Sequence, residues 1–262
     1  MASSTAVLGA RTGPPGHDAS LSRGRRRTAL TAALAAAAMG LALAAPVSGA
    51  AGPAMTRELL TLVDAGSSLA SVARQVDREG GTVLASYAVA DALLVVMPAG
   101  VHAPAGTVAV RDVPLHVTGI TAPSAVDIKG ATYRTTIGAP GSPAGAGITV
   151  AVVDTGVADV TDLAGRLTHL NLSGGPAGDG LGHGTFMAGL VAGDGTASGG
   201  TYVGVAPAAK ILDVQVAAAD GTTSLARVLS GLQAVADRAA TDPSLRVVSL
   251  ALSTGSPLPP SA

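Results

Sequence analysis

The chain has 262 residues and no cysteine, which excludes disulfides, thiolate nucleophiles and zinc–thiolate sites. The whole chain has a net charge of −1 and a single phenylalanine, and outside the N-terminus it offers neither a basic surface nor aromatic platforms for bases, which excludes nucleic acid as a partner. Hydrophobic residues make up 48% of the chain, and this share excludes disorder as a description of the whole.

Residues 1–50 have the pattern of a secretory signal peptide. The segment Arg23–Arg27 holds four arginines, and residues 29–45 follow without a charge. Small residues then stand at Ser48 and Ala50, as at a cleavage site. A membrane anchor is the alternative, but the apolar run is short for a span and consists mostly of weakly hydrophobic alanines. We therefore expect cleavage near Ala50 and a protein secreted to the extracellular space or the cell envelope.

Residues 51–118 are predicted to form a small α+β domain. The expected helix places its apolar residues on one face, and the strands around it carry apolar runs. The order of the elements predicts one sheet with a helix on one face. In chain order we expect a strand over 57–63, a helix over 67–81, two strands over 82–98 around a turn near Ala90–Asp91, and a last strand over 106–117.

Residues 119–146 are rich in Gly, Pro, Ser, Ala and Thr. This composition predicts an exposed linker between two domains. Low complexity alone also allows a disordered spacer.

Residues 147–262 are predicted to form an α/β fold with a mostly parallel sheet. Continuous apolar runs indicate strands that are buried on both faces. The helix over 222–240 is expected to be capped by Thr222 or Thr223. Alternation of strands and helices implies right-handed crossovers. The expected elements are strands over 147–154, 209–218 and 245–253, and helices over 183–193 and 222–240.

Two residues of this second domain are candidates for chemistry. Asp154 follows an apolar strand, and functional groups gather at the carboxyl ends of parallel strands. Taken alone, such an aspartate is more often a turn or cap residue. His183 stands between Gly182 and Gly184, which allow close approach of the backbone. A lone histidine is also compatible with a structural role, so the case depends on the surrounding segments.

The segments around both residues resemble the subtilisin-like serine proteases, the subtilases of peptidase family S8. "VAVVDTGV" and "GHGTFMAGLVAG" resemble the family's aspartate and histidine motifs, and the segments 204–216, 220–240 and 247–256 follow in the family's order. The resemblance implies a three-layer fold of subtilisin type. It also extends to residues 51–118, which resemble a subtilase propeptide, an intramolecular inhibitor and chaperone of the catalytic domain.

The resemblance implies a role for each matching residue. Asp154 would orient His183, which would act as general base and then general acid, while a serine hydroxyl attacks the peptide carbonyl of a polypeptide substrate. Ala251, Leu252 and Ser253 would pair with the substrate backbone. They stand where the family has Ser-Leu-Gly. No cofactor and no metal ligand is implied, although structural calcium is compatible with the family.

The matched motifs leave the nucleophile without a counterpart. The sequence has no Gly-Thr-Ser-x-Ala motif, and its only asparagine, Asn171, precedes His183 and does not match the family's oxyanion-hole asparagine. Ser256 is followed by proline, which does not suit a nucleophile at a helix start. We expect an N-terminal part of a protease precursor, inactive as given. The alternatives are a noncatalytic subtilase relative that binds or inhibits proteases, and a nucleotide-binding domain, which the lack of a G-x-G-x-x-G motif disfavours.

Overall fold

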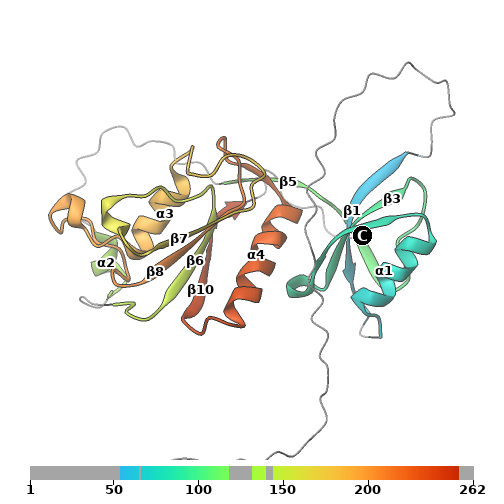
Figure 1. Ribbon diagram of the computed structural model, residues 1–262, viewed down its shortest axis with the longest axis horizontal. Helices are drawn as coiled ribbons and strands as arrows, with labels where there is room; N and C mark the ends of the chain where they lie inside the picture. The colour runs from blue at the N-terminus through green and yellow to red at the C-terminus, as the bar shows by residue number, and fades with distance from the viewer. Residues whose placement is uncertain (1–53, 65, 118–131, 140–143, 254–262) are drawn as a thin grey trace, which may run out of the picture. The chain divides into compact units, whose positions relative to one another are not determined.

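The computed structural model describes residues 54–64, 66–117, 132–139 and 144–253 (Figure 1). These residues all belong to one compact unit that runs from Ala50 to Ala262. The expected signal peptide, most of the expected linker and Ser256 lie outside the described residues. No helix within the described ranges is long and apolar enough to cross a membrane.

The N-terminal part forms an antiparallel sheet with one helix packed against it. The sheet has the strand order β2-β3-β1-β4, and Ser68 caps the helix through a capping box with Ser71. Val72 and Val76 of the helix pack with Leu60 and Val95 of the sheet. The predicted sheet with a helix on one face is therefore present. Its elements are β1 (Met55–Leu62), α1 (Leu69–Arg78), β2 (Thr82–Tyr87), the short 3₁₀ helix η1 (Ala88–Ala90), β3 (Ala92–Pro98) and β4 (Thr107–Arg111).

The single strand predicted over 106–117 is wrong, because the chain leaves the first sheet at Asp112. After β4 it continues as β5 (Pro114–Val117), which belongs to a different, three-stranded sheet. Asp112 and Val113 bond to the start of a later helix instead of to β1: Asp112 Oδ1 accepts from the N–H of Ala226, and the carbonyl of Val113 accepts from Leu225. Pro114 cannot continue the ladder as a donor because it lacks an N–H.

The C-terminal part is built on a four-stranded parallel sheet in the order β10-β6-β8-β7. All six residues of β6 are buried, as predicted for a strand covered on both faces. Its strands are β6 (Thr149–Asp154), β7 (Leu167–Asn171), β8 (Lys210–Gln215) and β10 (Leu245–Leu250), and its main helices are α3 (His183–Ala192) and α4 (Leu225–Ala239).

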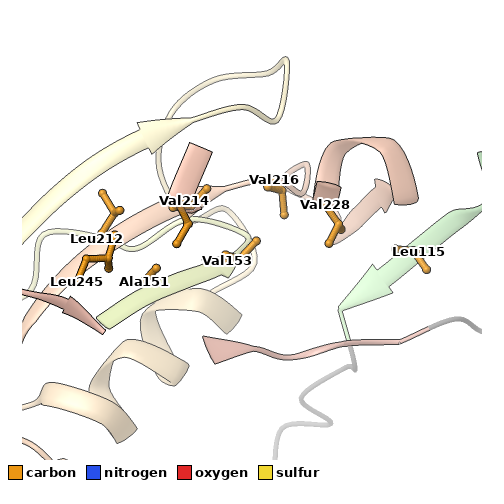
Figure 2. Close-up of a cluster of buried hydrophobic side chains, with 9 residues drawn as sticks. Leu115, Ala151, Val153, Leu212, Val214, Val216, Val228 and Leu245 are labelled. Carbon is orange, nitrogen blue, oxygen red and sulfur yellow. The ribbon is translucent and has the colours of Figure 1, made fainter. Parts of the chain in front are cut away.

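The two helices cover opposite faces of this sheet. Ala151 and Val153 of β6 pack with residues of α4, in the cluster that Figure 2 shows around Val153, Val214 and Val228. Val150 and Val152 point the other way and pack with Ala188 of α3. This alternation along one strand places a helix on each side of the sheet, which is the three-layer α/β arrangement expected from the sequence.

Three details of this part differ from the predictions. The strand β7 was not predicted, because "LTHLN" alternates leucine with polar residues and lacks a continuous apolar run. The cap of α4 is Ser224, whereas Thr222 and Thr223 lie in the short strand β9 (Thr222–Ser224). The apolar segment 245–253 is divided into β10 and β11 (Leu252–Ser253), and within the described residues β10 is an edge strand. The remaining short elements are α2 (Thr132–Thr136), η2 (Thr161–Leu163) and η3 (Thr196–Ser198).

Candidate active site

The structure brings Asp154 and His183 into direct contact. Asp154 is the last residue of β6, and His183 is the first residue of α3. The imidazole Nδ1 lies 2.7 Å from Oδ1 of Asp154, and the two side chains are only 4% and 1% exposed. An ionised carboxylate only accepts hydrogen bonds, so the proton of this bond belongs to Nδ1. The ring therefore keeps Nε2 as its basic nitrogen.

Glycines allow the helix to approach the end of β6 this closely. A side chain on Gly184 would place its Cβ 2.1 Å from the carbonyl oxygen of Gly156, a distance no packed side chain tolerates. Gly182, the residue before the helix, has φ of 87°, in the left-handed region that glycine adopts without strain. Close backbone packing thus explains the glycine after His183, and backbone conformation explains the glycine before it.

Two polar residues that the sequence analysis did not single out complete the surroundings of the pair. The N–H of Thr155 donates to Oδ1 of Asp154 at 2.7 Å, and the hydroxyl of Thr155 donates to Asp179. Asp179 also accepts hydrogen bonds from the backbone at Gly182 and Thr185. Burial raises the pKa of the Asp179 carboxyl, but the hydrogen bonds from Thr185, Thr155 and Gly182 outweigh it and hold that pKa below its ordinary value.

The residues predicted to pair with a substrate lie next to β5. Leu252 pairs antiparallel with Val117, and Ser253 pairs with His116. On its other side β5 pairs with β9, with His116 opposite Thr222. Ala251, the third predicted residue, lies between β10 and β11 and belongs to neither strand. The middle strand of this small sheet thus comes from the N-terminal part of the chain, and both flanking strands come from the C-terminal part.

The end of β5 lies close to the loop that precedes His183. The N–H of Val117 donates to the carbonyl of Gly221, and a side chain on Gly221 would collide with the side chains of both Val117 and Leu181. Leu181 is two residues before His183 in the sequence. The three-stranded sheet is therefore a neighbour of the Asp154–His183 pair.

A second aspartate–histidine contact joins the neighbouring strands β7 and β8. His169 of β7 places Nδ1 2.9 Å from Oδ2 of Asp213, its partner on β8, and Nε2 3.4 Å from Asp159. The hydrogen bond to Asp213 raises the pKa of His169, and the nearby carboxylates add to this increase. Burial raises the pKa of Asp213. Both shifts favour a proton held between the two side chains.

Other polar groups considered in the sequence have local structural contacts. Asn171 accepts from the N–H of Ser173 and donates to the carbonyl of Gly175, so its side chain holds the turn after β7. Within the described ranges no three His, Asp or Glu side chains gather into a group that could hold a metal ion.

Comparison with known proteins finds relatives for the C-terminal part of the chain. Residues 145–261 match the profile of the subtilase family, peptidase S8. A subtilisin-like protease of Coccidioides posadasii is 47% identical over 91 residues, covering 34% of this chain and 21% of that protein. Serine protease AprX of Bacillus subtilis is 42% identical over 93 residues, with the same two shares. Subtilisin BL of Lederbergia lenta is 39% identical over 90 residues, covering 34% of this chain and 33% of the relative.

The similarity to subtilases is thus confined to residues 145–261 in the family match. The chain spans between a fifth and a third of the length of the relatives named above. A solved structure, the epidermin leader peptide processing serine protease of Staphylococcus aureus, has the same fold, with a TM-score of 0.51 at 17% identity over 70% of this chain and 48% of that protein.

Proposed function

We propose that this chain supplies the aspartate and histidine of a secreted serine endopeptidase that hydrolyses polypeptides. The observation that carries the proposal is the buried 2.7 Å contact between His183 and Asp154 at the carboxyl end of β6. In that position the carboxylate fixes the tautomer of the ring and stabilises its protonated form. The match of residues 145–261 to the subtilase family supports the same assignment by resemblance.

The residues of the pair divide the chemistry between them. Nε2 of His183 takes the proton of a serine hydroxyl as the oxygen attacks the peptide carbonyl, and later returns it to the leaving amine. Asp154 keeps Nδ1 protonated throughout and stabilises the transient positive charge. The sequence of 262 residues has no Gly-Thr-Ser-x-Ala motif to supply that hydroxyl. We therefore expect no useful hydrolysis from this sequence unless a serine-bearing segment is joined to it.

The strands β9 and β11 are the proposed binding site for the substrate main chain. Both pair antiparallel with an extended segment that lies between them, now β5. Leu115 and Val117 of that segment are each only 7% exposed, while His116 points outward. A substrate in the place of β5 would gain main-chain hydrogen bonds from both sides and bury alternate side chains.

Residues 51–118 are proposed to inhibit the catalytic domain from within the same chain. Their last strand, β5, fills the proposed substrate position. A second contact supports this: the hydroxyl of Tyr87 lies 3.1 Å from that of Ser230 on α4, and the N–H of Val89 donates to Gln233 on the same helix. Leu59 and Leu94 of the first sheet pack against Ala226 of α4. Hydrophobic and polar contacts thus join the two parts of the chain.

Secretion is the remaining part of the proposal, and it rests on the basic and apolar pattern of residues 1–50. N-terminal sequencing of exported protein tests it, with a mature start near Ala50 expected. Retention of the intact segment in a membrane would instead support an anchor.

One experiment tests the catalytic proposal directly. Residues 51–262 are joined to the serine-bearing C-terminal segment of a subtilase, and hydrolysis of a peptide substrate is measured before and after His183→Ala. A fluorophosphonate probe for an activated serine gives a second readout. Turnover that is lost with His183→Ala supports the peptidase. Tight peptide binding without turnover or probe labelling would favour the noncatalytic, protease-binding alternative.

A further inference from the structure

Asp179 connects the loop that holds Asp154 to the turn that holds His183. Its Oδ1 accepts from the hydroxyl of Thr155 at 2.7 Å and from the N–H of Gly182 at 2.8 Å. Its Oδ2 accepts from the N–H of Thr185 at 2.8 Å and from the Thr185 hydroxyl at 2.6 Å. One carboxylate therefore holds the residues on both sides of the contact between Asp154 and His183.

All four of these partners donate to Asp179. The hydroxyl of Thr155 already accepts from the N–H of Gly184, and the hydroxyl of Thr185 already accepts from the N–H of Ala158. Their hydrogens are left for Asp179, while the two backbone groups donate by their nature. Only a group with acceptor capacity on both of its oxygens satisfies all four. An ionised carboxylate meets this need, and the lowered pKa of Asp179 agrees with it.

The network reaches the catalytic pair through three covalently adjacent groups. Thr155 follows Asp154 directly and also donates its N–H to Oδ1 of that residue. Gly182 and Gly184 flank His183 on either side. We propose, on the basis of the function proposed above, that Asp179 is a positioning residue that fixes His183 against Asp154. It touches neither substrate nor the reacting atoms in this assignment, and it acts through the two backbones that it ties together.

The substitution Asp179→Asn separates this role from a general need for a polar side chain. An amide keeps the size of the carboxylate but replaces one oxygen by an NH₂ group, which is a donor. In one orientation the NH₂ faces the N–H of Gly182, and in the other it faces the N–H of Thr185. Either way a backbone donor loses its acceptor next to His183, and the turn must move.

A matched control exists at the opposite end of the sheet. Asp242 accepts from the N–H of Ser244 at 3.0 Å and from its hydroxyl at 2.6 Å, as Asp179 does from Thr185. It precedes β10, whose parallel pairing with β6 places Asp242 at the amino ends of the strands, away from Asp154. Asp242→Asn therefore removes a similar local motif without a connection to the pair.

The readout is the proton on Nδ1 of His183, observed by NMR in the full 262-residue chain. A proton shared with a carboxylate and shielded from water gives a far-downfield signal that exchanges slowly, and its loss in His183→Ala and Asp154→Asn identifies it. Asp179→Asn should abolish the signal or speed its exchange about tenfold or more, because hydrogen bonds to a half-buried charged group are lost. Asp242→Asn should leave shift and exchange rate unchanged. A thermal melt of each variant shows that the fold persists.

The outcomes distinguish the positioning role from the proposed function. An unchanged signal in folded Asp179→Asn overturns the positioning role alone. A wild-type chain without a signal that depends on both His183 and Asp154 overturns the pair itself, and the positioning role with it. If Asp179→Asn does not fold, Thr185→Val and Thr185→Ser decide: the serine variant keeps the hydroxyl and should behave like the wild type, whereas valine should exchange faster. Equal rates in these two variants overturn the proposal.

Discussion

In the part of the chain that the structure describes, His183 and His169 each place Nδ1 against a buried aspartate at nearly equal distance, and the surroundings of the two contacts differ. In both, Nδ1 of the ring lies against a buried carboxylate, at 2.7 Å for His183 and at 2.9 Å for His169. His183 starts a helix at the carboxyl end of the sheet, and its side chain is 4% exposed. His169 lies within an edge strand, is 42% exposed, and has a second carboxylate near Nε2.

This difference teaches that the contact alone does not make a catalytic pair. A general base needs a free Nε2 that faces a substrate position, and Nε2 of His169 is directed toward Asp159 instead. Oδ1 of Asp154 accepts from the N–H of Thr155 as well as facing His183, and a proposed substrate strand lies nearby. The two contacts therefore predict very different responses to substitution.

The largest expected difference concerns catalysis. In residues 51–262 joined to a serine-bearing subtilase segment, we expect His183→Ala to lower the rate of peptide hydrolysis by about 10⁴-fold or more. Asp154→Asn should cause a loss of similar order, since the wrong tautomer of the ring is then favoured. His169→Ala should leave hydrolysis within about threefold of the parent, since we assign no chemistry to that ring. Near-normal turnover in His183→Ala would refute the catalytic assignment.

The second prediction asks whether β5 occupies the substrate position next to Asp154 and His183. The domain 51–118 added in trans should inhibit the same hydrolysis in a dose-dependent way. Leu115→Ala in that domain should weaken inhibition by roughly 30-fold or more, because truncating a buried leucine typically costs a few kcal/mol. Leu115 lies beyond the first sheet, so the domain should still fold. Val108→Ala, at an exposed position of β4, is the control, and equal weakening by both would count against the assignment of β5.

How far the sequence anticipates these features depends on the physics behind each one. β6 and α4 are predictable because a continuous apolar run and a helical period are local signals. Asp154 and His183 are predictable because their motifs resemble a family. The break at Asp112 and the strand β7 depend on partners distant in the chain, and so does the network of Thr155 and Asp179. Hydroxyl and carboxylate side chains are common in turns, so their pattern alone does not show which ones meet.

The third prediction tests the close packing of α3 against the end of β6, which brings His183 to Asp154. Gly184→Ala should lower the free energy of unfolding by roughly 1–3 kcal/mol, because its Cβ would collide with the Gly156 carbonyl and push α3 away from β6. A Cβ on Gly189, in the same helix, would meet nothing within 4 Å, so Gly189→Ala should be neutral or slightly stabilising. Urea unfolding of the two variants provides the measurement. Equal stability of the two variants would mean that the approach of α3 is looser than the structure shows.

The smallest expected effect concerns the contact between His169 and Asp213 and its response to pH. The pKa of His169 is raised in the folded protein, mainly by its hydrogen bond to Asp213. A group that binds its proton more tightly when folded stabilises the protein fully below its unfolded pKa, and this stabilisation is lost as pH rises through the folded pKa. His169→Gln should therefore destabilise the protein more at about pH 5.5 than at about pH 9. The difference should stay below ~1 kcal/mol, since the ring is 42% exposed and solvent screens it.

Urea unfolding at both pH values measures this difference, with His102→Gln as the control for removing an exposed imidazole. A larger loss at the higher pH would show that His169 is held neutral, and the two contacts would then be more alike than their surroundings indicate.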